Sequence, residues 1–173
     1  MTVADASRPE TLIRPMSAAD RDAVIALLWE LNRFEAELDR TLQPFDDRDT
    51  SYEAAVACFE RDCELAAEHE GALFVAERGG TVVGFLCWLV ETGEPFVRAE
   101  LRRYGYVVDL VVASSHRGGG IGSALLEQAE KLTRSKGLNR LAIGVLRGND
   151  GAARAYARFG FAPYSAEMFK DLD

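Results

Sequence analysis

The sequence is poor in the residues that build disulfide frameworks and metal sites. Its 173 residues include three cysteines and two histidines, and they form no CxxC or mixed Cys/His spacing. An odd number of cysteines without framework spacing is typical of a reducing compartment. We therefore expect no metal, and we interpret Cys58, Cys63 and Cys87 as small apolar residues of the fold.

Long apolar runs and basic clusters are also absent. No apolar run reaches about 18 residues, so we predict no membrane span, and residues 1–14 lack the apolar centre of a secretory signal. We therefore expect a cytoplasmic protein. The formal net charge is −8, whereas nucleic-acid binding depends on basic residues that neutralise phosphates. The charge argues against a nucleic-acid partner.

The negative charge is concentrated in the first half of the chain. Residues 30–70 contain 13 acidic and four basic residues. Such a concentration is consistent with a solvated helical surface. It is also consistent with a surface that attracts a cationic substrate.

Apolar periodicity predicts a short tail, residues 1–10, followed by one domain, residues 11–173. The order of elements indicates an α/β domain of α+β type, with a mixed sheet of six to seven strands and about four helices. We expect helices over 20–38, 51–69, 121–135 and 149–159, strands over 11–14, 72–77, 81–91, 104–113 and 138–146, one or two further strands within 161–169, and a loop over 92–103. In the helix over 51–69 the apolar register is less regular; its positions include Ala55, Cys58, Phe59, Asp62 and Leu65.

A glycine-rich loop joins the strand over 104–113 to the helix over 121–135. It reads Arg117-Gly118-Gly119-Gly120-Ile121-Gly122 and is followed by Ser123. The start of a helix presents unpaired N–H groups and the positive end of the helix dipole, and glycines let a phosphate approach the main chain. Arg117 adds a fixed positive charge. The loop therefore predicts a pyrophosphate site, although its spacing fits neither the dinucleotide fingerprint nor the P-loop.

This loop and the helix after it resemble the GNAT acetyltransferase superfamily. The loop matches the family pattern Arg/Gln-x-x-Gly-x-Gly at Arg117, Gly120 and Gly122. The next helix matches Asn-x-x-Ala-x-x-x-Tyr-x-x-x-Gly-Phe, with every spacing kept, at Asn149, Ala152, Tyr156, Gly160 and Phe161. The resemblance covers residues 104–161. It departs from the family at Gly119, where many relatives carry a second basic residue.

The resemblance implies a GNAT-like fold whose sheet is splayed between its fourth strand, 104–113, and its fifth, 138–146. It implies acetyl-CoA as cosubstrate, bound in that gap. Tyr156 would be the general acid near the CoA sulfur, with packing as the alternative role, and Asn149 would hold CoA or cap its helix. The remaining cofactor-binding residues implied are Leu110, Val111, Val112, Arg117, Gly118, Gly119, Gly120, Ile121, Gly122, Ser123 and Ala152.

The sequence does not settle the general base. Asp109 lies among valines in the central strand, so it is the first candidate to accept the amine proton, through water, or to orient a substrate ammonium. The alternative is a carboxylate on the hydrogen-bonded or solvent side of the strand. Glu91 and Glu94 are alternatives. We expect His116 to flank the phosphates and His69 to end a helix.

These observations together predict an N-acetyltransferase that transfers an acetyl group from acetyl-CoA to a primary amine by direct attack in a ternary complex. The acidic first half favours a small cationic acceptor. A protein acceptor, at lysine or at the N-terminus, is the alternative within this class. A non-catalytic acyl-CoA-binding sensor is the alternative of another class, and the resemblance also allows a homodimer.

Overall fold

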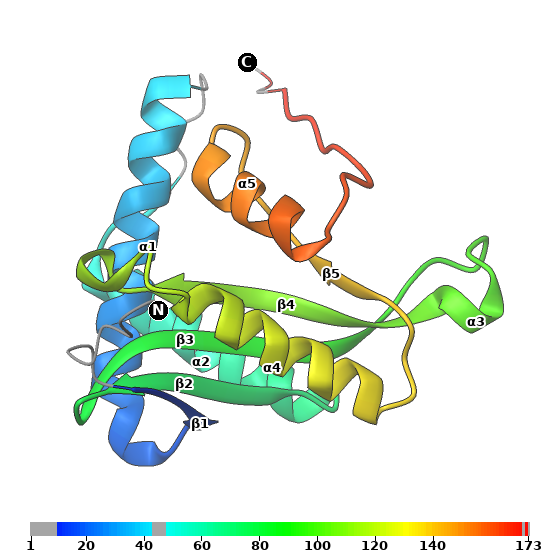
Figure 1. Cartoon of the computed structure of the whole chain (residues 1–173). Coiled ribbons are helices and arrows are strands. Elements are labelled where there is room, and N and C mark those ends of the chain that lie inside the picture. Colours follow the sequence, from blue (N-terminus) through cyan, green and yellow to red (C-terminus); the bar gives the residue numbers. More distant parts are fainter. Residues whose placement is uncertain (1–9, 43–47, 171, 173) are drawn as a thin grey trace, which may run out of the picture.

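The chain folds around a mixed β-sheet. The structure is a computed structural model and describes residues 10–42, 48–170 and 172. Within these residues the sheet has five strands in sequence order, with β4 and β5 parallel and all other neighbours antiparallel (Figure 1). The strands are β1 (Thr11–Pro15), β2 (Ala72–Arg78), β3 (Thr81–Thr92), β4 (Arg103–Val112) and β5 (Leu141–Ile143). A single α/β domain with a mixed sheet is therefore confirmed.

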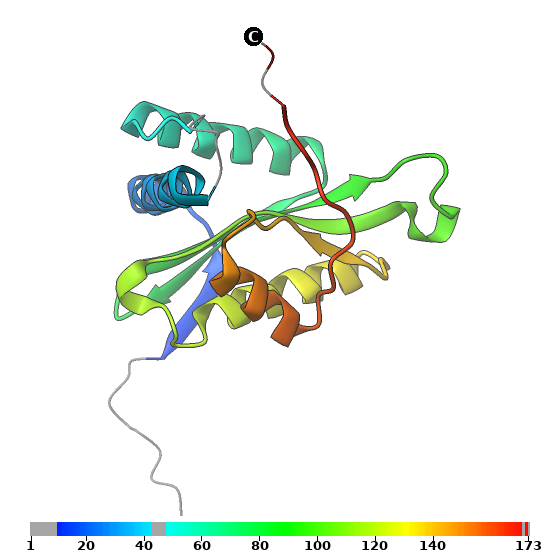
Figure 2. The same cartoon turned by 90° about the horizontal axis from the view of Figure 1, so that it is seen from above.

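Helices cover both faces of the sheet. Figure 2 shows α1 (Arg21–Leu42) and α2 (Tyr52–Glu68) on one face, and α4 (Ile121–Ser135) and α5 (Asp150–Phe159) on the other. The loop expected over 92–103 contains a short helix, α3 (Ala99–Arg102), and two 3-10 turns precede α1 and α4: η1 (Ala18–Asp20) and η2 (Ser114–His116). No helix in the described part of the chain is long and apolar enough to cross a bilayer.

Two apolar clusters hold these layers together. On the side of α1 and α2 the cluster includes Val24, Leu28, Phe59 and Phe85. The second cluster lies on the side of α4. It includes Leu125 and Ala129, which are four residues apart on that helix, and Leu86 and Trp88 from the opposite face of β3. Because both faces of β3 are covered, its residues 83–90 are buried without a break.

The strands predicted within 161–169 are wrong. The described residues 161–170 form no strand, so the sheet stops at β5, which itself covers only three residues rather than 138–146. Pro163 has no N–H to donate to a strand ladder. Tyr164 and Met168 are 82% and 93% exposed, so the segment as it lies here buries neither of these apolar residues. The predicted tail falls outside the described residues except for Glu10.

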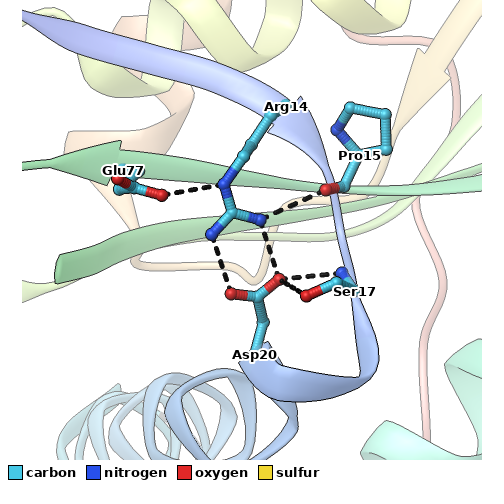
Figure 3. Close-up of polar contacts among 5 residues, drawn as sticks. All are labelled: Arg14, Pro15, Ser17, Asp20 and Glu77. Atoms are coloured by element: carbon cyan, nitrogen blue, oxygen red, sulfur yellow. Dashed lines mark hydrogen bonds and ion pairs between the residues drawn. The ribbon is translucent and has the colours of Figure 1, made fainter. Parts of the chain in front are cut away.

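Hydrogen bonds from Arg14 of β1 connect the start of α1 to the sheet (Figure 3). Its guanidinium donates to both carboxylate oxygens of Asp20, each at 2.8 Å, and its Nε donates to Glu77 of β2 at 2.8 Å. Asp20 is buried and also accepts from the main-chain N–H and the hydroxyl of Ser17. These bonds, led by that from Arg14, hold the pKa of Asp20 well below its usual value.

One extra residue interrupts the pairing of β4 with β3. Asp109 lies opposite Cys87, but Val107 lies opposite the next residue, Trp88, so Val108 is bulged. On its other side β4 pairs with β5 only through residues 105–107. Beyond the bulge, this edge of β4 is therefore left without a strand partner among the described residues, at the place where the resemblance implies a splay.

Candidate active site

A cleft of about 880 Å³ opens beside the unpaired part of β4. Residues of α1, β4, the start of α4, the segment after β5, and α5 line it. Apart from Gly119, every predicted site residue lines this cleft: Asp109, Leu110, Val111, Val112, Arg117, Gly118, Gly120, Ile121, Gly122, Ser123, Asn149, Ala152 and Tyr156. A smaller cavity of about 280 Å³, beside Thr133 and Phe159, contains none of them.

The loop before α4 has the backbone shape that requires glycine. Gly118 and Gly120 have φ angles of +74° and +82°, a region that other residues adopt only at a cost. A Cβ at either position would meet no atom within 4 Å, so conformation rather than crowding demands glycine. The N–H of Ala124 donates to the Gly120 carbonyl at 3.0 Å. The amides of residues 121–123 precede it and have no intrahelical acceptor, so they can bind an anion in the cleft.

Gly119 does not contribute to the cleft lining. A Cβ at this position would lie 3.5 Å from Nη1 of Arg78, which comes from the end of β2. The guanidinium of Arg78 is held by the hydroxyl of Thr11. The structure thus places a cation from another element beside Gly119, the position at which the sequence lacks a basic residue.

Arg117 connects the loop to α1. Its Nε donates to the Val112 carbonyl at 3.1 Å, and its Nη2 lies 3.4 Å from Oε1 of Glu30. The same Glu30 oxygen accepts from the main-chain N–H of Ser114 at 2.7 Å. The guanidinium also stacks over the ring of Phe34, 5.0 Å from its centroid. Its positive charge therefore lies at the rim of the cleft, next to the carboxylate of Glu30 on α1.

Asn149 and Tyr156 reach the cleft from α5. The Asn149 side chain accepts from the Ala152 N–H at 3.1 Å, so it caps the helix as one of the two predicted roles requires. Tyr156 is half-buried. Burial first, and the nearby acids Glu35 and Asp109 next, raise the pKa of its phenol to about 12. The phenol is therefore protonated at neutral pH and available as a proton donor.

Comparison with known proteins identifies the family. The profile of the acetyltransferase (GNAT) family matches residues 28–161. The chain belongs to the GNAT family. Membership places it among the N-acetyltransferases, a class of acyltransferase, as the resemblance predicts.

Individual GNAT relatives differ in what they act on. An N-alpha-acetyltransferase of Sulfurisphaera tokodaii is 33% identical over 101 residues, which cover 57% of this chain and 60% of that protein. A GCN5-related N-acetyltransferase from Ralstonia eutropha superposes with a TM-score of 0.70 at 25% identity, covering 94% of this chain and 99% of the other. An aminoglycoside N-acetyltransferase in complex with CoA superposes with a TM-score of 0.66 at 18% identity, covering 98% and 99%. The match spans about 60% of the length of the first of these relatives.

The acidic residues of this GNAT protein divide into those inside and those outside the cleft. Asp109 lines it, and burial raises the pKa of its carboxyl, which makes it a stronger base than an exposed aspartate. Glu91 lies opposite Tyr104 at the far end of β4, and neither it nor Glu94 lines the cleft. His116 lines the cleft beside the loop, whereas His69 closes the end of α2. In the described part of the chain no three acidic, histidine or cysteine side chains form a metal-binding group.

Sequence reasoning missed an ion pair in the cleft wall. Glu35 of α1 lies 2.7 Å from Nη1 of Arg48, and both residues line the cleft. Glu35 follows Leu28 and Leu31 at helical spacing, so the sequence places an acid on an otherwise apolar helix face. That pattern could have indicated a functional residue. Arg48 carries no comparable signal. It comes from a polar segment without periodicity.

Proposed function

We propose that this GNAT protein transfers the acetyl group of acetyl-CoA to the primary amine of a small cationic acceptor, by direct attack in a ternary complex. One observation carries the proposal. A single cleft joins the glycine loop at the start of α4, the unpaired edge of β4, a protonated phenol at Tyr156 and a basic carboxyl at Asp109. These are the parts that acetyl transfer to an amine needs.

The residues of the cleft fit CoA. The amides of residues 121–123 and the left-handed Gly118 and Gly120 suit a pyrophosphate, with Arg117 at the rim. The edge of β4 from Val108 to Val111 has no strand partner on this side and suits the amides of the pantetheine arm, since an unpaired strand edge offers both donors and acceptors. When bound, the cosubstrate supplies an activated acetyl thioester.

Two side chains of the protein then carry out the proton transfers. An acceptor amine arrives as an ammonium at neutral pH, and Asp109 takes one proton to give the neutral amine that attacks the thioester carbonyl. Tyr156 donates its proton to the departing thiolate and regains one from the nitrogen of the new amide. The balance is one acetyl amide, one CoA thiol and one proton released to water. Positioning both substrates in one cleft supplies much of the remaining acceleration.

The acidic first half of the chain favours a cationic acceptor. Residues 30–70 carry 13 acids against four basic residues, and a surface with an excess of one sign of charge attracts ligands of the opposite sign. Within the cleft, Asp109 is the acid that such an acceptor would meet. A protein acceptor is the second candidate, because the curated relative from Sulfurisphaera tokodaii is named an N-alpha-acetyltransferase.

An acetyl-CoA thiol-release assay tests the proposal against three panels: small polyamines and amino sugars, neutral amines of matched size, and short peptides. We expect kcat/KM to be highest for the cationic small amines and to fall as ionic strength rises, because salt screens the attraction. Faster turnover of peptides would favour the protein acceptor. CoA binding without turnover in any panel would instead support the sensor alternative.

A further inference from the structure

Asp62 of α2 is a buried acid that the site described above leaves unexplained. Its side chain is fully buried, and neither carboxylate oxygen accepts a hydrogen bond from a donor group of the described residues. The nearest cation, Nη1 of Arg61, lies 3.8 Å from Oδ1, beyond hydrogen-bonding distance, on a side chain that is 61% exposed. An ionised carboxylate in such a place costs several kcal/mol. Asp62 therefore needs either a proton or a partner.

Asp109 is that partner. The thiol of Cys87 on β3 contacts the main-chain carbonyl of Asp62 at 3.8 Å, and Cys87 is the cross-strand neighbour of Asp109. The bulge at Val108 directs Asp109 towards this side of the sheet, and the two carboxyl groups lie within hydrogen-bonding reach of each other. Ionised carboxylates only accept hydrogen bonds, so the pair bonds only if one member keeps a proton.

The proton belongs on Asp62. Asp62 is fully buried, whereas Asp109 is half-buried and opens onto the cleft, where its charge is partly solvated. Burial first, and the charge of Asp109 next, raise the pKa of Asp62 to about 8. A hydrogen bond from Asp62 acts in the opposite direction on the pKa of Asp109 and favours its ionised form. At neutral pH the pair therefore holds one proton.

We propose that Asp62 is a positioning residue, whose protonated carboxyl donates a hydrogen bond to Asp109 and holds that carboxylate towards the acceptor amine. This inference rests on the proposed function. Asp109 can then take the proton of the ammonium with its other oxygen, while the proton of Asp62 stays in place. Asp62 itself touches neither substrate, because α2 contributes no residue to the cleft lining.

Other ionisable groups surround Asp62 and Asp109, and a variant that tests the pair must leave these groups unchanged. They are Arg61 and Cys63 from α2, Cys87 from β3, Glu35 from α1, Arg48 from the segment before α2, and Tyr156 from α5. Isosteric changes at Asp62 leave all of them in place.

Infrared difference spectroscopy tests the shared proton without any turnover. We expect the wild-type protein at neutral pH to show the C=O band of a protonated carboxylic acid, which D62N removes and D109N shifts but retains. Absence of the band, or its survival in D62N, would overturn the proposal. A band without turnover of any amine would refute the proposed activity and leave the hydrogen-bonded pair standing.

Kinetics test the positioning role. We expect D62A to lower kcat/KM by roughly 10- to 100-fold, the value of one hydrogen bond to a charged group, with the Kd for CoA unchanged. D62N should recover most of the loss, because its amide donates to Asp109 in place of the acid. The wild type should also lose kcat/KM as Asp62 ionises near pH 8, whereas D62N should not, with the same acceptor in both profiles. Equal losses in D62A and D62N, or identical pH profiles of wild type and D62N, would contradict the assignment.

Discussion

At the scale of single residues, the phenol of Tyr156 offers the sharpest chemical test. Replacing Tyr156 with Phe keeps the ring, and so its packing, but removes the proton that the leaving thiolate needs. We expect kcat to fall by about 10²-fold or more, in the range of general acid catalysis, with little change in the Kd for CoA. Since the pKa of Tyr156 is raised to about 12, this acid should cause no loss of kcat between neutral pH and about pH 9.

Tyr164 supplies the matched control. Its ring is 82% exposed and lies outside the cleft, so Tyr164→Phe should leave both kinetic constants unchanged. An unchanged kcat in Tyr156→Phe, with acceptors that the wild type turns over well, would show that another group or water protonates the thiolate.

Sequence motifs located some residues of the site and were silent about others. The loop Arg117–Gly122, Asn149 and Tyr156 were predicted because their spacing is local, and the structure brings all but Gly119 into one cleft; their roles stay predictions. Asp62 and Arg48 come from elements without a motif. Only the packing of α1 and α2 on the sheet brings them near Asp109, and no local sequence pattern predicts that these residues will be neighbours.

At the scale of elements, the turn into α4 depends on its left-handed glycines. A valine at Gly120 would be strained by at least about 1–2 kcal/mol at φ +82°, and the loop would have to rearrange. We expect Gly120→Val to raise the Kd for CoA by roughly tenfold or more, measured by calorimetry.

Gly137→Val is the control for that experiment. Gly137 has a φ of +69° and follows the other end of α4, and a Cβ placed there would also meet no atom within 4 Å. Both variants should lose similar stability, but Gly137→Val should bind CoA normally. Similar affinities in the two variants would argue against a phosphate site at the start of α4.

The junction of β1 with α1 is expected to be a stability element. Asp20→Asn removes the charge that binds Arg14, and we expect it to lower the free energy of unfolding by about 2 kcal/mol, less than for a fully buried pair because Arg14 is 29% exposed. Asp20 has a lowered pKa, so its contribution is present above about pH 4 and is lost as pH falls further. Chemical denaturation of the variant at neutral and acid pH measures both effects.

The neighbouring Asp22 is the control, because it lies in the first turn of α1 but its side chain is 90% exposed. Asp22→Asn should change the free energy of unfolding by less than about 0.5 kcal/mol. A similar loss in both variants would mean that general charge, rather than the Arg14 contact, stabilises this junction.

The elements themselves were predicted where periodicity is strong and misplaced where it is weak. Residues 121–135 were predicted as a helix and form one, because an apolar stripe from Leu125 to Leu132 and a glycine at each end define it. Residues 161–169 look like a strand by composition, yet the structure gives them no pairing. Composition indicates which residues favour extended backbone, but only the neighbouring edge decides whether they join a sheet.

At the scale of the whole molecule, the acid pair makes stability depend on pH in an unusual direction. The pKa of Asp62 is raised from 3.8 to about 8, so the folded state binds a proton that the unfolded state has released. Its stabilising effect is complete below about pH 4 and is lost as pH rises towards 8. D62N has no titrating group at this position, so the Tm of the wild type should fall relative to that of D62N, by about 10 °C between about pH 5 and about pH 8.5. A constant difference in Tm would mean that Asp62 is ionised throughout.

The extra residue in β4, Val108, separates two parts of the strand that have different surroundings. Up to Val107 its alternation is set by the partnership with β5, and from Asp109 onward by the cleft. Removing Val108 would close the bulge and leave Asp109 opposite Cys87, so that the later residues would keep their partners on β3 and only the local bend of β4 would be lost. A relative that is one residue shorter at this point would therefore align its acid with Asp109 only if the gap is placed at Val108.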